Sequence, residues 1–467
     1  MKNKINKSEE PPEIAVKFAN LVFVLGILFS ILLVVFAIYK IYNYSGFASQ
    51  AFYTISLLSG GMFAIFFGLG LKRLSNNLKV NLSIVFFTVG ITVYGFETYL
   101  ELSKRTIGNT DKRKALALQM GVPYDMRTKI EVVGDLRNFG VEAFPNVFPE
   151  NLITSNGLLS NNGPIYPLGT ISNSTTINAN ESGYYPIIET DEHGFNNPKG
   201  LYIKNKVDII LVGDSFTEGC CVHSEETISA ILRQFNFNTI SVGKGGNGPL
   251  VELATLKEYA EPLKPKIVVW LHYVNDFNNL NSEMRSSILK KYLNEDNYSQ
   301  NLIKRQEEID GVLINYIKSE QKKLKNKEIE ILELIIKTIK LTKLRKMINL
   351  QTAFTPIPSL TFKDILQKSE QMVSNWGGKM YLVYLPEYKK YITADELERR
   401  NRDFVTQVTT ELDIPIIDIQ SEVFDLHPDV SSLFPFRVSG HYNAEGYKLV
   451  AETIGKRLEA DGYSSKK

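Results

Sequence analysis

Three long apolar stretches in the first hundred residues constrain the fold of this chain more than any other feature. Phe18 to Tyr39 runs for about 22 residues without a charge, which at roughly 1.5 Å per residue crosses a bilayer. Ala51 to Leu71 is a second stretch, and Val80 to Phe96 is a shorter third that reaches Leu100 if Glu97 lies at the interface. A secretory signal peptide accounts only for the first, and three buried core helices explain uncharged runs of this length less well. We therefore expect a three-helix transmembrane anchor.

The basic residues that flank the spans predict the orientation of this anchor, residues 1–104. Lys and Arg gather before the first span and between the second and third, whereas Lys40 alone lies between the first and second. Because cytoplasmic loops carry the excess of basic residues, we expect the N-terminus in the cytoplasm and everything after about residue 102 outside. Two basic residues beyond the third span oppose this, but they lead into a large domain, where the rule weakens. The flanking residues are Lys2, Lys4, Lys7 and Lys17, then Lys72, Arg73 and Lys79, and finally Lys104 and Arg105.

The rest of the composition narrows the class of protein. At 467 residues the chain exceeds one compact core, so we expect two or more structural units. The net charge of +2 gives no reason to expect a nucleic-acid partner. The two cysteines, Cys220 and Cys221, are adjacent, which argues against a disulfide framework and against a cysteine-based zinc site. We expect neither a metal nor a cofactor.

Residues 201–463 alternate short β-branched runs with helical patterns. The first run is apolar apart from Asp208, as is typical of a strand in a parallel sheet that is covered on both faces. This repetition predicts a doubly wound sheet in a flavodoxin-like three-layer α/β/α domain. The expected strands are Val207–Val212, Asn238–Val242, Lys266–His272, Lys379–Leu385 and Ile414–Ile419, and the expected helices are Thr227–Arg233, Leu250–Tyr259, Phe362–Ser374, Ala394–Leu412 and Ala444–Leu458.

Two segments depart from the alternation. Ser282 to Gln351, residues 282–351, is strongly charged with a helical pattern. We expect a helical insertion there, and we favour a solvated hairpin packed on the α/β domain over a partner-binding arm. Residues 105–200 are rich in Asn, Gly and Pro, with short strand-like pieces at Lys129–Val133 and Tyr184–Ile188. We expect a lead-in segment that wraps the α/β domain, with a small separate module as the alternative.

Gly213-Asp214-Ser215 follows the first expected strand directly. The triplet is short enough to occur by chance, so its position directly after a strand is the stronger indication of a functional site. The glycine permits a tight turn, and the serine then opens the next helix at the carboxyl end of the sheet, where α/β ligand sites lie. The unpaired N–H groups of the helix N-terminus favour a developing negative charge at that place.

Three further loops end at the same edge of the sheet. The glycine-rich loop Gly243–Gly248 can bring a backbone N–H close to a ligand or be a flexible turn, and its spacing is not a dinucleotide fingerprint. Asn275, after the third strand, can donate to an oxyanion or cap a helix. Of the five histidines, His441 alone lies beyond the last strand and just before a helix. We expect Ser, Gly, Asn and His to meet over one pocket. The remaining histidines, His193, His223, His272 and His427, are expected to be structural or peripheral.

This arrangement resembles the SGNH (GDSL-like) hydrolase superfamily, whose four blocks carry Ser, Gly, Asn and His. The resemblance covers about residues 185–460, outside the anchor and the insertion. The upstream sequence ETDEHGFNNP, Glu189–Pro198, looks like the lead-in of SGNH domains that act on extracellular polysaccharides, such as alginate-acetylation-type proteins. The resemblance implies Ser215 as nucleophile, His441 as its base, an oxyanion hole of the N–H groups of Ser215 and Gly246 with the Asn275 amide, and supporting roles for Asp214 and Asp276.

Two departures from the family pattern concern the base and the amide donor. The family usually has Asp two or three residues before the catalytic His, where Val438 and Ser439 stand here. It also usually has Gly before the third-block Asn, where this chain has Tyr273 and Val274. A backbone carbonyl could orient His441 instead, or Ser and His could work as a dyad. The preceding loop also offers two carboxylates, Asp425 and Asp429, and the sequence does not choose among these alternatives.

The resemblance implies a serine-dependent ester hydrolase or O-acyltransferase, by analogy an acetyl one, acting on an extracytoplasmic carbohydrate or polysaccharide. A non-catalytic carbohydrate-binding protein of the same fold is the alternative, and the missing Asp favours it. A third hypothesis is an assembly protein of an envelope polysaccharide complex that docks through residues 282–351.

Overall fold

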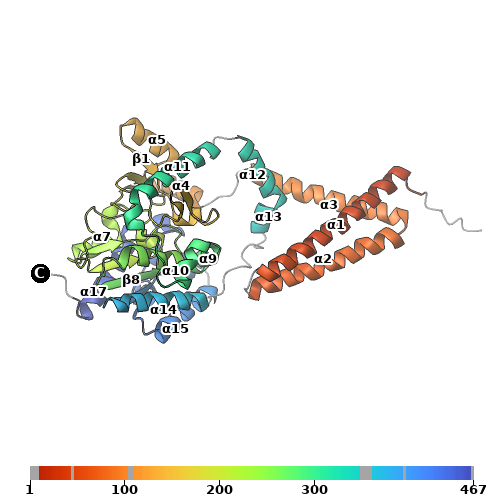
Figure 1. Ribbon diagram of the computed structural model, residues 1–467. Helices are drawn as coiled ribbons and strands as arrows, with labels where there is room; N and C mark the ends of the chain where they lie inside the picture. Colours follow the sequence, from red (N-terminus) through yellow and green to blue (C-terminus); the bar gives the residue numbers. More distant parts are fainter. Residues whose placement is uncertain are drawn as a thin grey trace, which may run out of the picture. The chain divides into compact units, whose positions relative to one another are not determined.

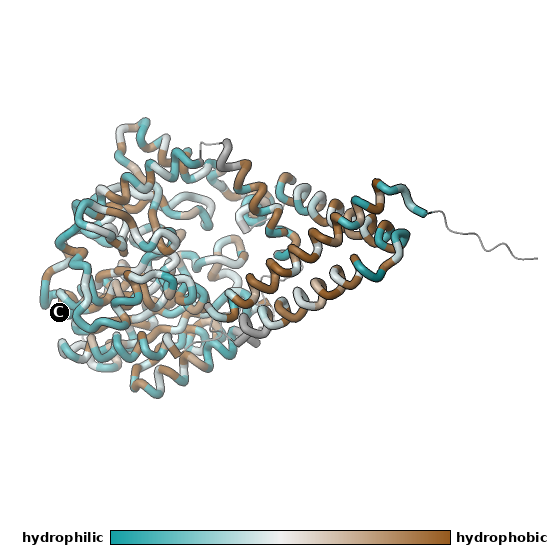
Figure 2. Tube along the Cα trace, turned by 45° about the vertical axis from the view of Figure 1, so that its right-hand side comes forward, coloured by the Kyte–Doolittle hydropathy of each residue, from teal (hydrophilic) through white to brown (hydrophobic). Residues whose placement is uncertain are grey.

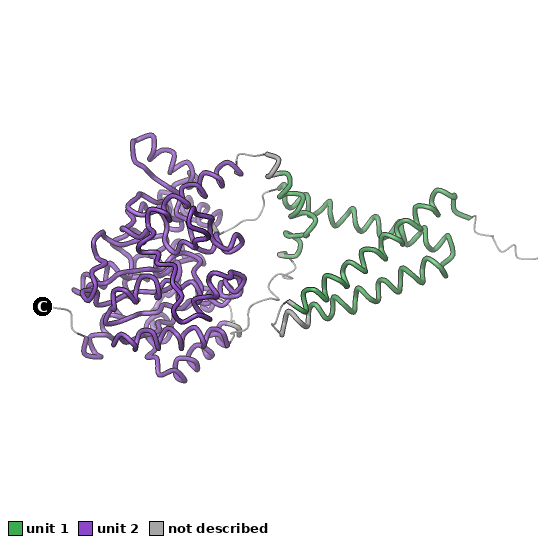
Figure 3. Tube along the Cα trace, viewed as in Figure 1, with its two compact units in different colours: residues 1–106, 326–355 green, residues 107–325, 356–467 purple. Residues whose placement is uncertain are grey.

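The computed structural model describes residues 10–43, 47–103, 109–324, 327–347, 360–392 and 396–463. These residues form two compact units, one of residues 1–106 with 326–355 and one of residues 107–325 with 356–467 (Figure 3). Several predictions concern residues outside the described ones, namely Lys2, Lys4, Lys7, Lys104, Arg105, Ala394 and the end of the insertion at Gln351.

Three long helices begin the first unit: α1 (Glu13–Asn43), α2 (Phe47–Arg73) and α3 (Asn76–Leu102). Each is long and apolar enough to cross a membrane, as predicted, and Figure 2 colours most of α1 as hydrophobic. Small residues let α1 and α2 approach closely, since a Cβ at Gly26 would lie 2.8 Å from the Phe67 ring.

The segment 282–351 is helical but divides between the two units. Its first part runs from the end of α9 (Asp276–Glu283) through α10 (Ser287–Asn294) and α11 (Gln306–Leu324), and it belongs to the α/β unit. Its second part, α12 (Lys327–Ile339) and α13 (Thr342–Met347), packs on α3 in the first unit. There the buried Glu97 carboxylate accepts the backbone N–H groups of Lys343 at 2.7 Å and Leu344 at 2.8 Å. The segment is therefore not one hairpin packed on the α/β domain.

The second unit contains the predicted parallel sheet (Figure 1). Its five strands pair in the order β10-β9-β8-β6-β7, and all pairs are parallel. In chain order this is 2-1-3-4-5, the flavodoxin-like order, so the predicted fold class is confirmed. The strands are β6 (Ile209–Val212), β7 (Thr239–Ser241), β8 (Ile267–His272), β9 (Lys379–Tyr384) and β10 (Ile416–Asp418).

Helices cover both faces of this sheet. Neighbouring residues of a strand point to opposite sides, so each strand contributes side chains to two cores. Ile210 and Trp270 face one apolar core, and Leu211 and Leu271 face the other. The first core is covered by α8 (Pro249–Thr255), α14 (Leu360–Asn375), α15 (Glu396–Glu411) and α11, and the second by α7 (Ile228–Gln234) and α17 (Ala444–Ala460). The unit therefore has the three layers that the alternation of runs predicts.

The lead-in segment is partly helical. It contains α4 (Asn109–Met120) and α5 (Lys129–Asn138), so the prediction of a strand-like piece at Lys129–Val133 is wrong. Thr128 and Glu131 form a capping box that starts α5 despite its β-branched residues. The short strands are β1 (Ala143–Pro145), β4 (Thr175–Ile177) and β5 (Ile187–Glu189), which form one sheet, and the hairpin β2 (Leu158–Ser160) and β3 (Gly163–Ile165).

The motif Glu189–Pro198 ties the lead-in segment to the sheet. The Asp191 carboxylate accepts the backbone N–H groups of His193 at 2.8 Å and Phe195 at 2.9 Å, which closes a tight turn. Asn197 then exchanges two hydrogen bonds of 2.8 Å with the backbone of Ser241 in β7. The motif thus provides hydrogen-bond partners for backbone groups of the edge strand β7.

A buried polar network joins the lead-in segment to two loops at the carboxyl edge of the sheet. Lys244 pairs with Glu218, and its ammonium also donates to the Asn146 amide oxygen at 2.7 Å. The Asn146 amide donates to Glu218 at 2.7 Å, and the Gly245 N–H donates to the same carboxylate at 2.9 Å. Since the charged side chains are at most 2% exposed, each depends on its partner for stability.

We predict that Lys244→Met lowers the free energy of unfolding by about 3–5 kcal/mol, because it leaves the Glu218 carboxylate buried and unpaired. Trp270 and Trp376, the only tryptophans, both lie in the α/β unit, so tryptophan fluorescence during urea unfolding of the full chain reports on this unit. The control is Lys363→Met at the solvent-exposed pair with Glu411, which should change the free energy of unfolding by less than about 1 kcal/mol. Equal stability of Lys244→Met and wild type would contradict the structural role of the network.

Candidate active site

Ser215 lies at the carboxyl end of β6, as its motif predicts. Gly213 has φ +156°, and a Cβ there would lie 2.1 Å from the Thr217 hydroxyl, so only glycine fits the turn. Ser215 is the first residue of the short helix α6 (Ser215–Glu218), which Asp214 caps by accepting the Phe216 N–H at 2.9 Å. The turn therefore fixes the serine at the start of a helix, next to free backbone N–H groups.

His441 lies against Ser215, although the two residues are far apart in the chain. Its Nε2 is 2.7 Å from the Ser215 Oγ. His441 precedes α17, whose start is fixed by Asn443, since the Asn443 side chain accepts the Gly446 N–H at 3.1 Å. The ring also packs on Phe216, with centroids 4.7 Å apart. The structure thus brings together the hydroxyl and the imidazole that the sequence singled out.

A carboxylate from the lead-in segment occupies the other side of the His441 ring. Glu181 Oε2 lies 3.3 Å from His441 Nδ1 and accepts the backbone N–H of His441 at 2.9 Å. The buried Arg113 pairs with this oxygen at 3.1 Å and also donates to the Ser439 carbonyl at 2.8 Å. A Cβ at Gly440 would lie 2.1 Å from the Arg113 guanidinium, so the close approach of these groups requires glycine.

Glu181 is not among the carboxylates that the sequence offers as partners of His441. The two carboxylates of the loop before His441 are engaged elsewhere, Asp425 with Lys390 at 2.8 Å and Asp429 with Arg437. Glu181 follows no strand of the sheet and belongs to none of the four motif blocks. Because only folding brings it to His441, no spacing in the sequence points to it.

The charges of this group favour one tautomer of His441. Burial alone would raise the pKa of Glu181, but its contacts with His441 and Arg113 hold that pKa at about 2. Burial would lower the pKa of His441, yet the neighbouring Cys220 and Glu181 raise it well above the usual value. When the ring is neutral, the ionised Glu181 accepts a hydrogen bond from Nδ1–H, so the lone pair on Nε2 faces the Ser215 hydroxyl.

The two expected oxyanion donors lie in loops after the strands that flank β6. Gly246 follows β7 in a left-handed conformation, φ +75°, and a Cβ there would collide with the Glu150 side chain at 2.2 Å. Asn275 follows β8, just before α9, and its side chain does not cap that helix. The buried Asn275 amide oxygen has no hydrogen-bond partner among the described residues. Both residues are at the carboxyl edge that carries Ser215.

Asp214 and Asp276 hold the loops around the site. Burial and the charge of Asp276 raise the pKa of Asp214 to about 7, although hydrogen bonds from the Phe216 N–H and the Asn275 amide oppose this shift. Asp276 accepts the Tyr273 N–H at 3.1 Å and lies 2.8 Å from His272 Nδ1. Burial lowers the pKa of His272 to about 3, so this histidine is neutral inside an aromatic core.

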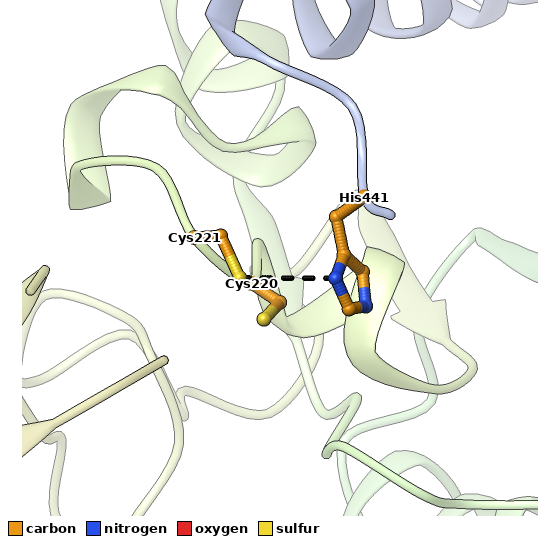
Figure 4. Close-up of side chains that lie close together, drawn as sticks. All are labelled: Cys220, Cys221 and His441. Atoms are coloured by element: carbon orange, nitrogen blue, oxygen red, sulfur yellow. Dashed lines mark hydrogen bonds between the residues drawn. The ribbon is translucent and has the colours of Figure 1, made fainter. Parts of the chain in front are cut away.

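The other histidines are elsewhere in the described part of the chain. His193 packs on Tyr202 and Tyr259, and His223 stacks on Tyr184. By contrast, two side chains that the sequence analysis set aside reach the site: the Cys220 and Cys221 thiols lie beside His441 (Figure 4). These thiols and the ring offer a set of metal-ligating atoms.

We predict that Glu181→Gln lowers the pKa of His441, because the neutral amide no longer stabilises the imidazolium. NMR titration of the full chain with isotope-labelled histidine measures this directly, and the remaining four histidine signals serve as the reference. An unchanged His441 titration in Glu181→Gln would contradict the contact between carboxylate and ring.

No protein-family model matches the sequence, and no curated protein matches it. Solved structures that match include the lipase/acylhydrolase from Enterococcus faecalis, with 12% identity, 56% of this chain and 100% of that chain covered, and a TM-score of 0.33. An acetyl xylan esterase matches with 14% identity, 54% and 100% coverage and a TM-score of 0.31. A GDSL-like lipase from Bacteroides thetaiotaomicron matches with 12% identity, 56% and 92% coverage and a TM-score of 0.30. The strand order of the sheet establishes the flavodoxin-like fold of the α/β unit.

Proposed function

We propose that this chain is a membrane-anchored, serine-dependent ester hydrolase or O-acyltransferase. The observation that carries the proposal is the line of three side chains: the Ser215 Oγ lies 2.7 Å from His441 Nε2, and Glu181 lies 3.3 Å from His441 Nδ1. A hydroxyl, an imidazole and an ionised carboxylate in this order activate serine as a nucleophile on several unrelated folds.

In the proposed mechanism the Ser215 Oγ attacks an ester carbonyl while its proton passes to His441 Nε2. Glu181 holds the ring and stabilises the imidazolium that forms, and Arg113 keeps Glu181 ionised. The N–H groups of Ser215 and Gly246 and the Asn275 amide stabilise the oxyanion.

Collapse of the tetrahedral intermediate leaves an acyl group on Ser215, and His441 Nε2 gives the proton to the leaving alcohol. Water then resolves the acyl-enzyme in a hydrolase, and a glycan hydroxyl resolves it in a transferase. The products formed with a polysaccharide acceptor present distinguish these outcomes.

The anchor and the lead-in motif support an extracytoplasmic carbohydrate or polysaccharide ester as the substrate, within envelope polysaccharide machinery. Basic residues before α1 and between α2 and α3 favour a cytoplasmic N-terminus and an α/β unit outside. A C-terminal alkaline phosphatase fusion, which folds only outside the cytoplasm, should therefore be active, and an inactive fusion would refute this orientation.

The absence of the usual Asp was the feature that favoured a non-catalytic binding protein. In the structure, the Glu181 carboxylate lies at His441 Nδ1, where the family's Asp would be expected, with Arg113 as its counter-ion. The structure therefore offers no specific support for the binding alternative.

We predict that a fluorophosphonate probe labels the full chain at Ser215 and that Ser215→Ala abolishes both the labelling and the hydrolysis of a small acetyl ester. The control is Ser421→Ala, at an exposed serine that bonds Asp418, which should label like wild type. Neither labelling nor hydrolysis by wild type would refute the proposed activity, and equal labelling of Ser215→Ala would refute the assigned nucleophile.

Asn275→Ala should lower kcat by about 10²- to 10³-fold with a small change in KM, because the amide acts on the oxyanion rather than on the bound ester. The helix is spared, since the Asn275 side chain does not cap α9. Asn278→Ala, at an exposed position of the same helix, is the control and should keep the wild-type kcat. A kcat for Asn275→Ala within a few-fold of wild type would exclude this donor.

A further inference from the structure

Two thiols lie beside the His441 ring, and the Cys221 thiol faces the ring nitrogen that does not contact Ser215. One ligand atom each from Cys220, Cys221 and His441 lie within 4.8 Å of one another, and the Cys221 Sγ is 3.7 Å from His441 Nδ1 (Figure 4). Both cysteines are free, and they are only 5% and 0% exposed. Buried sulfur atoms around a ring nitrogen form the donor set that thiophilic cations such as Zn²⁺ prefer.

The backbone that carries the two thiols is fixed from both sides. Cys221 has φ +74°, a left-handed conformation that a non-glycine residue adopts at a cost. Its carbonyl accepts the Ser182 hydroxyl of the lead-in segment at 2.8 Å, and the Cys220 carbonyl accepts the Tyr447 hydroxyl of α17 at 3.1 Å. These hydrogen bonds hold both sulfur atoms next to the histidine.

The spacing of the donors suits a tetrahedral ion. With Zn–S near 2.3 Å and Zn–N near 2.0–2.1 Å, neighbouring ligand atoms of a tetrahedron lie about 3.4–3.8 Å apart. The separation of Cys221 Sγ and His441 Nδ1 is 3.7 Å, and no pair in the cluster exceeds 4.8 Å. Closing the cluster on an ion thus needs a small movement of side chains.

We propose that Cys220, Cys221 and His441 form a binding site for a thiophilic divalent cation of the Zn²⁺ type, and that the bound ion switches off the esterase reaction. The ligand site stands on its own geometry, whereas the inhibition rests on the proposed function. Three protein ligands leave one position for a water or for Glu181, which lies 3.3 Å from His441 Nδ1.

Inhibition follows from the two nitrogens of the imidazole ring. As a base, His441 needs its proton on Nδ1, beside Glu181, and a free lone pair on Nε2. A cation takes the lone pair of Nδ1, so the neutral ring carries its proton on Nε2 and can only donate toward Ser215. Both thiols release their protons to solvent on binding, so two thiolates balance the charge of the ion.

The sequence argued against a cysteine-based zinc site, because adjacent cysteines lack the spacing of a zinc motif. The third ligand is His441, more than two hundred residues further along the chain, and only the fold brings it to the thiols. The site is thus a regulatory addition to the active site and not a structural zinc centre.

The test titrates the full chain, in detergent with a phosphine reductant, with ZnCl₂ and CoCl₂. We expect one Zn²⁺ per chain to inhibit hydrolysis of a small acetyl ester, with recovery on adding EDTA, and Co²⁺ to give a thiolate-to-cobalt charge-transfer band. Cys220→Ser should weaken both effects at least about tenfold, and Cys220→Ser with Cys221→Ser should abolish them. Each rate is compared with that of the same variant without metal.

Two further variants make the result specific. His223→Gln, an exposed histidine two residues from Cys221, should keep both the band and the inhibition. Ser215→Ala should keep the band without any activity, so loss of the proposed function and loss of the metal site are told apart. Absence of the band in wild type, or a band or inhibition that survives in the double cysteine variant, would overturn the proposal.

Discussion

The site depends on one imidazole held between a hydroxyl and a carboxylate. His441 contacts Ser215 through one nitrogen and Glu181 through the other, and each partner comes from a different part of the fold. Ser215 is fixed by the turn after β6, His441 by the start of α17, and Glu181 by the lead-in segment with Arg113. Because a base works only when its ring is oriented and its tautomer is set, the proposed active site requires all three segments.

This dependence explains why the lead-in segment is inseparable from the α/β unit. Burying Glu181, Glu218 and Lys244 is costly, and each is stabilised only by partners that other segments supply. Asn197 adds hydrogen bonds to the edge of the sheet, so the segment protects β7 as well. The motif that resembled a polysaccharide-enzyme lead-in therefore has a structural role here, independent of any substrate.

Features that depend on contiguous residues could be predicted from the sequence. The apolar runs predict the strands. Ser215 is indicated by its place between a strand end and a helix start, and His441 by its place just before the last helix. Glu181 was not visible, since its only signal is a contact across 260 positions of the chain. The start of α5 was missed although its signal was present: Thr128 and Glu131 match a capping box, which outweighed the β-branched residues that follow. The sequence does not predict that residues 282–351 divide between the two units, because the pattern of a charged helix is the same whichever unit it packs on.

The central claim is that Ser215, His441 and Glu181 act as one unit. The most direct test is the rate of hydrolysis of a small acetyl ester by Ser215→Ala, His441→Ala, Glu181→Gln and the triple variant, each as the full chain. If the three residues are one unit, the triple variant is about as slow as Ser215→Ala alone, because the first loss already removes what the others support. If the separate losses multiply, the residues act independently, and the account of the site is wrong.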